Sequence, residues 1–172
     1  IMGMGLREIM EFFKTTYGLV GGTDELIKER RGLMYELLLK NLTLMPGASE
    51  LIKYLFLHHI PMAIATSGHS KEKTKEIIKY LGLEKSFTIF VSGDDFEKAK
   101  PAPDMYLVAA KMLHIDPKDC LVFEDAPNGV VAGKAAGTQV YAVNKDVLLQ
   151  EKLRSAGADK VFSCLKDVHL DL

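Results

Sequence analysis

Short apolar runs alternate with longer amphipathic segments along most of this 172-residue chain. After Pro46-Gly47, the apolar runs predict β-strands, and the segments between them predict helices of about 10–12 residues. The predicted strands are 61–66, 87–92, 120–124, 139–143 and 160–163. The predicted helices are about 48–58, 71–81, 103–113, 128–136 and 146–156. Unbroken apolar strands that alternate with helices are typical of an α/β fold, in which helices cover both faces of a parallel sheet.

The first 42 residues have a different pattern, which predicts helices only. Apolar residues recur at helical spacing from Leu6 to Tyr17, and Gly18 favours a helix end. Thr23 or Asp24 is predicted to cap a second helix. The side of that helix expected to be buried comprises Leu26, Ile27, Leu33, Met34, Leu37 and Leu38. We therefore predict a small helical domain at 1–42 and an α/β core at 43–172.

Polar signatures follow the predicted strands, at the sheet edge where ligands bind in α/β folds. The first is Thr66-Ser67-Gly68, whose hydroxyl and free backbone N–H groups can bind a phosphate oxygen. Ordinary helix capping is the alternative interpretation of this segment. His69 follows directly and is a candidate substrate contact.

The second signature is Lys100-Pro101-Ala102-Pro103. Two prolines stiffen the backbone and fix the direction in which the lysine projects, and Pro103 can begin a helix. An ammonium group held in this way can stabilise the charge of a phosphoryl group. A solvent-exposed lysine in front of a helix is the alternative.

The third signature is Glu124-Asp125, which ends a fully apolar strand. Two acids at that position are costly unless they are paired or bind a metal, and their hard oxygen atoms suit Mg²⁺. One helix-capping acid beside one ion-paired acid is the alternative. Asn128-Gly129 is expected to form a tight turn into the next helix.

The composition excludes several partners. A formal net charge of -1 and a pI of 6.6 predict no field that would gather nucleic acid or anionic lipid. A solvated helix face is predicted for Lys71, Lys73, Lys75 and Lys79. Cys120 and Cys164 are predicted to be reduced thiols, and no apolar stretch is long enough to span a bilayer. We expect a cytoplasmic monomer that binds neither nucleic acid nor membranes.

At these signatures, the chain resembles the haloacid dehalogenase superfamily of aspartate-nucleophile phosphotransferases. Thr66-Ser67 matches the second motif of that family, Lys100 the third and Glu124-Asp125 the fourth. The sequence FEDAPNGVVAGKAAG and the helical segment before LMPG are similar to the branch that includes β-phosphoglucomutase and pseudouridine-5'-phosphatase. The resemblance implies a Rossmann-like three-layer parallel sheet core, at 43–172, and part of a small α-helical cap, at 1–42.

The resemblance also implies a Mg²⁺-dependent phosphatase that acts on a small phosphorylated metabolite, a sugar or nucleoside phosphate, through an aspartyl-phosphate. Phosphoryl oxygens would be bound by Thr66, Ser67 and Gly68, and Lys100 would bridge the nucleophile and the phosphate. Asp125, together with Glu124, would hold Mg²⁺. Residues of the cap segment expected to face the substrate are Gly3, Gly5 and Arg7.

The first motif of the family, Asp-x-Asp-Gly, is absent, because no two aspartates here are separated by one residue. The chain begins with Ile1, so we expect the natural protein to extend upstream and to carry the first strand, the nucleophile and the first cap helix. This chain alone is then predicted to be inactive. A phosphomutase of the same family and a catalytically dead phosphometabolite-binding protein are the alternatives. A signalling receiver domain is disfavoured, because its acidic pair precedes its Lys-Pro.

Overall fold

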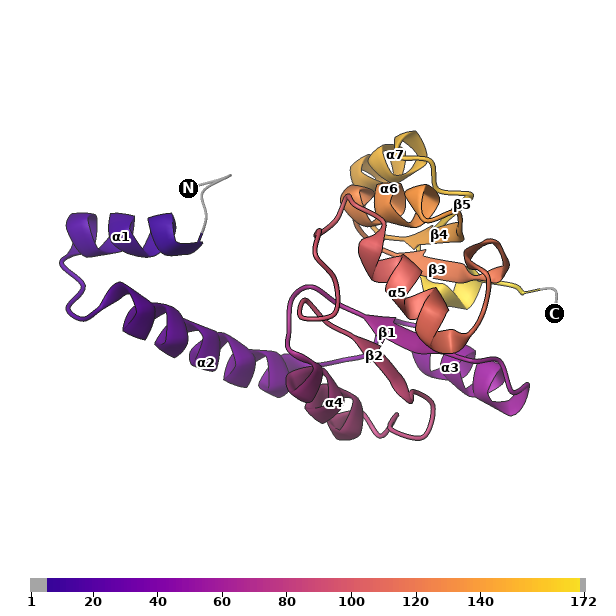
Figure 1. Cartoon of the computed structure of the whole chain (residues 1–172), viewed down its shortest axis with the longest axis horizontal. Helices are drawn as coiled ribbons and strands as arrows, with labels where there is room; N and C mark the ends of the chain where they lie inside the picture. Colours follow the sequence, from indigo (N-terminus) through magenta and orange to yellow (C-terminus); the bar gives the residue numbers. More distant parts are fainter. Residues whose placement is uncertain (1–5, 171–172) are drawn as a thin grey trace. The chain divides into compact units, whose positions relative to one another are not determined.

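The computed structural model describes residues 6–170 and divides the chain into two compact units, residues 1–43 and residues 44–172 (Figure 1). We call the first the helical unit and the second the core unit. The boundary between them lies within one residue of the predicted domain boundary.

The helical unit contains two helices that pack against each other, α1 (Leu6–Tyr17) and α2 (Thr23–Asn41). Met10 of α1 is 5% exposed, and Lys14 Nζ donates to Thr23 Oγ1 over 3.3 Å. Gly18 has a positive φ of 67°, and α1 ends directly before it, as predicted. The predicted cap of α2 is wrong by one residue. Gly22 is the N-cap, since α2 begins at Thr23, and the Glu25 carboxylate accepts the backbone N–H of Gly22 over 3.4 Å.

The apolar side of α2 is far more exposed than its sequence pattern predicts. Leu33, Met34 and Leu37 are each more than half exposed, whereas Leu26 and Ile27 are partly buried. The side chain of Leu38 is outside the description. The reason for the difference is length. At 1.5 Å per residue, the 12-residue α1 cannot cover the whole of the 19-residue α2.

Helices and strands alternate along the core unit, as predicted. Its helices are α3 (Ala48–Leu57), α4 (Lys71–Tyr80), α5 (Asp104–Leu113), α6 (Pro127–Ala135) and α7 (Val147–Ser155). Its strands are β1 (Ala63–Ala65), β2 (Ile89–Val91), β3 (Leu121–Glu124), β4 (Gln139–Val143) and β5 (Lys160–Phe162). Single 3₁₀ turns at Pro117–Asp119 and Leu165–Asp167 had no counterpart in the sequence prediction.

All strand pairs are parallel, as predicted, but they form two sheets. β1 pairs with β2, with Ile64 opposite Phe90, and the second sheet has the order β3-β4-β5. Among residues 6–170, the other edges of β1 and β3 have no strand partner. Helix α5 packs against β1 and β2 and also contacts α6, which covers β3 and β4 (Figure 1). The two sheets therefore share one core.

Apolar side chains bury both faces of the three-stranded sheet. Val140 and Ala142 of β4 are fully buried and pack with α6 and α7. On the opposite face, the ring of Tyr141 lies 6.0 Å from Phe123 and 5.5 Å from Phe162, centroid to centroid. This alternation explains why residues 140–143 of strand β4 form an unbroken apolar run.

Across the described part of the chain, every helix is too short or too polar to cross a membrane. Cys120 and Cys164 are free and partly buried in this structure, and their reduced state stays a prediction. Burial, together with the charges of Asp119 and Asp116, raises the pKa of the Cys120 thiol, so this thiol is a poor nucleophile at neutral pH.

Candidate active site

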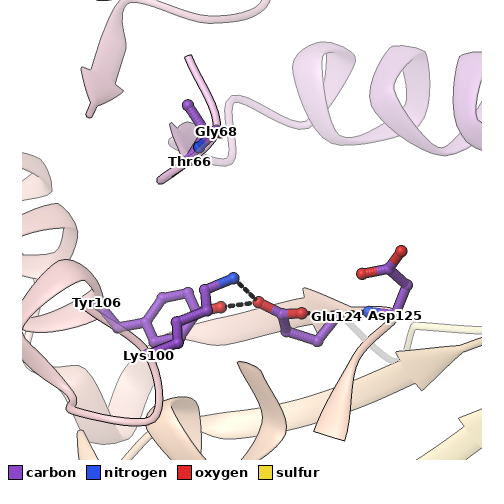
Figure 2. Close-up of polar contacts among 6 residues, drawn as sticks. All are labelled: Thr66, Gly68, Lys100, Tyr106, Glu124 and Asp125. Carbon is purple, nitrogen blue, oxygen red and sulfur yellow. Dashed lines mark hydrogen bonds and ion pairs between the residues drawn. The ribbon is translucent and has the colours of Figure 1, made fainter. Parts of the chain in front are cut away.

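The candidate residues of the core unit lie at the last residue of strand β3 or on the loops that follow strands β1, β2 and β3 (Figure 2). Thr66 comes directly after β1, Lys100 lies in the loop that leads from β2 to α5, and Asp125 comes directly after β3. The strands are parallel and belong to one core unit. The three signatures therefore stand at the carboxyl ends of strands, as predicted.

The loop at 66–70 connects β1 to α4 and contains the predicted phosphate-binding segment. The Thr66 backbone N–H donates to Val91 O over 2.9 Å, and Thr66 Oγ1 accepts the N–H of Gly68 over 3.1 Å. Helix capping belongs to Ser70, whose hydroxyl accepts the N–H of Lys73 over 3.4 Å. Ser67 and Gly68 are exposed, and His69 is half-buried. Because Ser70 caps the helix, the exposed residues Ser67 and Gly68 remain accessible to a ligand.

A buried network joins Lys100, Tyr106 and Glu124. Glu124 Oε1 accepts an ion-paired hydrogen bond from Lys100 Nζ and a second hydrogen bond from the Tyr106 hydroxyl (Figure 2). Glu124 Oε2 accepts the backbone N–H of Asp125 over 3.2 Å. The Glu124 side chain is 6% exposed and that of Lys100 is 23% exposed. Lys100 is therefore held in place, which excludes the alternative of a freely solvated lysine.

Gly129 provides the space that the Glu124 carboxylate occupies. A Cβ built at Gly129 would overlap the carboxylate carbon and both of its oxygens. The expected tight turn at Asn128-Gly129 is wrong, because both residues lie inside helix α6. The physical role of Gly129 is to let the helix approach a buried carboxylate closely.

Tyr106 is a site residue that the sequence analysis missed. Burial raises the pKa of its phenol far above the ordinary value of 10.0, and the hydrogen bond to Glu124 and the charges of Glu124 and Asp125 raise it further. The hydroxyl stays protonated and acts as a donor. Its ring also lies under the Lys100 ammonium, 5.3 Å from centroid to Nζ. The available signal was a polar aromatic residue in the first turn of a largely apolar helix.

Asp125 is the acid that remains accessible. Its side chain is exposed, and its backbone carbonyl accepts Asn144 Nδ2 over 3.3 Å, which ties it to the end of β4. Among the described residues, no group of three His, Cys, Asp or Glu side chains could hold a metal by itself. Mg²⁺ commonly uses one or two protein carboxylates and completes its shell with phosphate and water. Asp125 and the second oxygen of Glu124 fit such a partial ligand set.

The structure does not test three candidate residues of the helical unit. Arg7 forms an exposed ion pair with Asp24 inside the helical unit. Gly3 and Gly5 lie outside the described residues. Their assignment as substrate contacts stays a prediction.

The sequence and fold match a known family. The profile of the Haloacid dehalogenase-like hydrolase family matches residues 1–143, and the chain belongs to this family. It is 36% identical to a probable pseudouridine-5'-phosphatase of Drosophila melanogaster, over 97% of this chain and 73% of that protein. It is 32% identical to a phosphorylated carbohydrates phosphatase of Thermotoga maritima, over 98% of this chain and 81% of that protein.

A longer relative and a solved structure add to these matches. The chain is 41% identical to the bifunctional riboflavin kinase/FMN phosphatase of Arabidopsis thaliana over 74% of its own length, but it spans 33% of that protein. A beta-phosphoglucomutase-like protein of Thermotoga maritima has the same fold, with a TM-score of 0.82 and 28% identity over 93% of this chain and 74% of that one. These findings confirm the expected family, branch and α/β fold class.

Proposed function

We propose that this chain forms most of a Mg²⁺-dependent phosphatase that hydrolyses a small phosphorylated metabolite, such as a sugar or nucleoside phosphate. The observation that carries the proposal is the Lys100–Tyr106–Glu124 network beside the accessible Asp125 carboxylate. A positive charge and a metal-binding acid at the strand ends form a site for a phosphate group. The substrate classes named for the relatives support the same conclusion.

Each residue has a separate task in this proposal. The Thr66 hydroxyl and the Ser67 N–H bind phosphoryl oxygens, and the Gly68 N–H, which donates to Thr66 Oγ1, orients that hydroxyl. Lys100 stabilises negative charge on the phosphoryl group, worth on the order of 4 kcal/mol per unit-charge pair at about 4 Å and an effective dielectric near 20. Because Glu124 and Tyr106 already hold Lys100, little reorganisation is needed when the charge develops.

Asp125 is the proposed principal metal ligand, with Glu124 Oε2 as the second. A bound Mg²⁺ would supply further positive charge against the phosphate oxygens. Glu124 would then have two tasks, since its Oε1 atom is already committed to Lys100 and Tyr106. Asp125, which has an exposed side chain, is free to turn towards a ligand.

The nucleophile is proposed to come from a further parallel strand that carries Asp-x-Asp-Gly. The unpaired edges of β1 and β3 support this proposal, because such a strand could pair with both and join the two sheets. Its first aspartate would attack phosphorus and form an aspartyl-phosphate, while the second protonates the leaving alcohol. Water would then cleave the aspartyl-phosphate and release inorganic phosphate. Residues 1–172 alone would be inactive, since they contain no such motif.

A panel of phosphomonoesters, assayed by phosphate release, tests the proposal with a longer protein, defined as residues 1–172 together with the proposed Asp-x-Asp-Gly strand. We expect hydrolysis of at least one sugar or nucleoside phosphate, its loss in EDTA, and a fall of about 100-fold or more in kcat for Lys100→Ala. Lys98→Ala is the matched control, because Lys98 lies two residues away and its side chain is exposed. Hydrolysis that survives both EDTA and the loss of Lys100 would contradict the proposal.

Lys100→Ala leaves the Glu124 carboxylate buried without its cation and can impair folding. A second variant, Lys100→Met with Glu124→Gln, removes both charges and keeps the volumes similar. It is expected to fold, as judged by circular dichroism, and to remain as inactive as Lys100→Ala.

A further inference from the structure

A second charged cluster lies next to the phosphate-binding loop, and it consists of Lys71, Ser92 and Asp95. Lys71 Nζ and Asp95 Oδ1 form an ion pair of 2.8 Å, with side chains 32% and 22% exposed. The predicted solvated lysine face of α4 is therefore wrong at Lys71. The physical reason is that Lys71 is the first residue of α4, where the helix begins beside the end of strand β2.

Contacts with Ser92 fix the Asp95 carboxylate independently of Lys71. Asp95 N donates to Ser92 O over 3.0 Å, which closes a turn directly after β2. Asp95 Oδ2 accepts both the N–H of Ser92, over 2.8 Å, and its hydroxyl, over 3.2 Å. Ser92 is fully buried. Three hydrogen bonds thus tie Asp95 to the end of the strand, and its other oxygen remains for Lys71.

Contacts with the end of strand β2 and with the turn after it fix both ends of the 66–70 loop. At its start, Thr66 N donates to the carbonyl of Val91, the last residue of β2. At its end, Lys71 is anchored by Asp95, four residues beyond Val91. The exposed residues Ser67 and Gly68 lie between these two anchors. A loop fixed at both ends loses less conformational freedom when it binds a ligand.

We propose that Asp95 is a positioning residue, which pre-organises the phosphate-binding loop by anchoring Lys71 to the end of β2. This inference rests on the proposed function, since it assigns that loop to phosphate. Asp95 itself does not touch the substrate. Its effect passes through Lys71 to the Thr66 hydroxyl, which the Gly68 N–H orients, and to the Ser67 N–H, and both groups must point in one direction to bind an anion.

Titration of residues 1–172 with inorganic phosphate, followed by the backbone ¹⁵N–¹H signals of Thr66, Ser67 and Gly68, tests the inference. We expect saturable shifts of these signals in the unmodified chain. Asp95→Asn should raise the dissociation constant about fivefold, which is the effect expected from the loss of a partly exposed, charge-assisted hydrogen bond. Asp94→Asn, which alters the exposed neighbour, is the matched control and should bind like the unmodified chain.

Further variants separate positioning from direct binding. Lys71→Met should weaken phosphate binding as much as Asp95→Asn does, and the double variant should be no weaker than either, because both remove one interaction. Lys71→Arg keeps the charge and should restore affinity, whereas Lys79→Met, on the same helix, should change nothing.

The outcomes distinguish the two proposals. If Thr66, Ser67 and Gly68 do not respond to phosphate in the unmodified chain, both this inference and the phosphate role of the loop fail. If the unmodified chain responds and Asp95→Asn binds equally well or more tightly, only this inference fails, and Lys71 acts by direct contact or not at all. If the Asp95→Asn chain no longer folds, the phosphate affinities of Lys71→Met and Lys71→Arg are compared instead. Equal affinity in that pair overturns the inference.

Discussion

Tyr106→Phe removes one oxygen atom from the core and leaves the ring in place. Tyr106 is 7% exposed, so the lost interaction is a hydrogen bond to a carboxylate that is itself only 6% exposed. Hydrogen bonds to charged groups contribute about 1.5–3 kcal/mol. Lys100 and the Asp125 N–H still solvate Glu124 in the variant, so we expect the free energy of unfolding to fall by about 2 kcal/mol.

Urea unfolding of residues 1–172, followed by circular dichroism at neutral pH, measures this change. With a slope of about 2 kcal/mol per molar, the midpoint should fall by about 1 M. Tyr80→Phe is the matched control, because Tyr80 is 62% exposed, and its midpoint should stay unchanged. A Tyr106→Phe midpoint equal to that of Tyr80→Phe would refute the reasoning, since the Glu124 carboxylate would then not depend on the phenol.

Other predictions follow from the same contacts. Gly129→Ala should unfold at lower urea than Tyr106→Phe, because its Cβ displaces the whole Glu124 carboxylate; an unchanged midpoint would contradict the close approach of α6. Gly133→Ala should cost about 1–3 kcal/mol of unfolding free energy in the same assay, because its Cβ would stand 2.7 Å from Val140 Cγ2 in a fully buried cluster; full stability would show that the core can yield there. The hydrogen bond from Lys71 and that from the Ser92 N–H hold the pKa of Asp95 below the ordinary 3.8, so its stabilisation is present above that value and is lost as the pH falls through the folded pKa. The difference in unfolding free energy between the unmodified chain and Asp95→Asn should therefore shrink below about pH 4, and a constant difference would contradict the ion pair.

The sequence predicted the order and type of the elements because each strand and helix carries its own periodicity. Strand β4 matches its predicted range, since its last four residues are apolar and buried on both faces, and only Gln139 at its start is polar and exposed. The other predicted strands are longer than the observed ones. Their outer residues, such as Pro61 and Thr88, have no ladder partner, and pairing depends on the neighbouring strand rather than on local sequence.

The sequence motifs predicted candidate residues for the site, but not the contacts between those residues. Lys100 and Glu124 were assigned to the same sheet edge from their positions after strands, but nothing in the sequence pairs them with each other. That pairing needs Tyr106 of α5 and the missing side chain at Gly129 of α6 to meet at one carboxylate. Such contacts between distant segments are set by tertiary packing, which periodicity does not encode.

The apolar face of α2 also shows that a sequence pattern does not determine tertiary packing. A pattern predicts which residues could be buried, but α1 is too short to bury Leu33, Met34 and Leu37 within the helical unit. Burial requires a partner surface of sufficient length, and only the three-dimensional structure shows whether that surface exists.

The central claim is that this chain supplies the phosphate loop, the lysine and the metal acids, and that a separate strand supplies the nucleophile. The most direct test measures phosphate release from the same phosphomonoester by the longer protein and by residues 1–172, side by side in Mg²⁺. The account predicts release by the longer protein and none by residues 1–172. Release by residues 1–172 that exceeds the release by a Lys100→Ala version of them would contradict it.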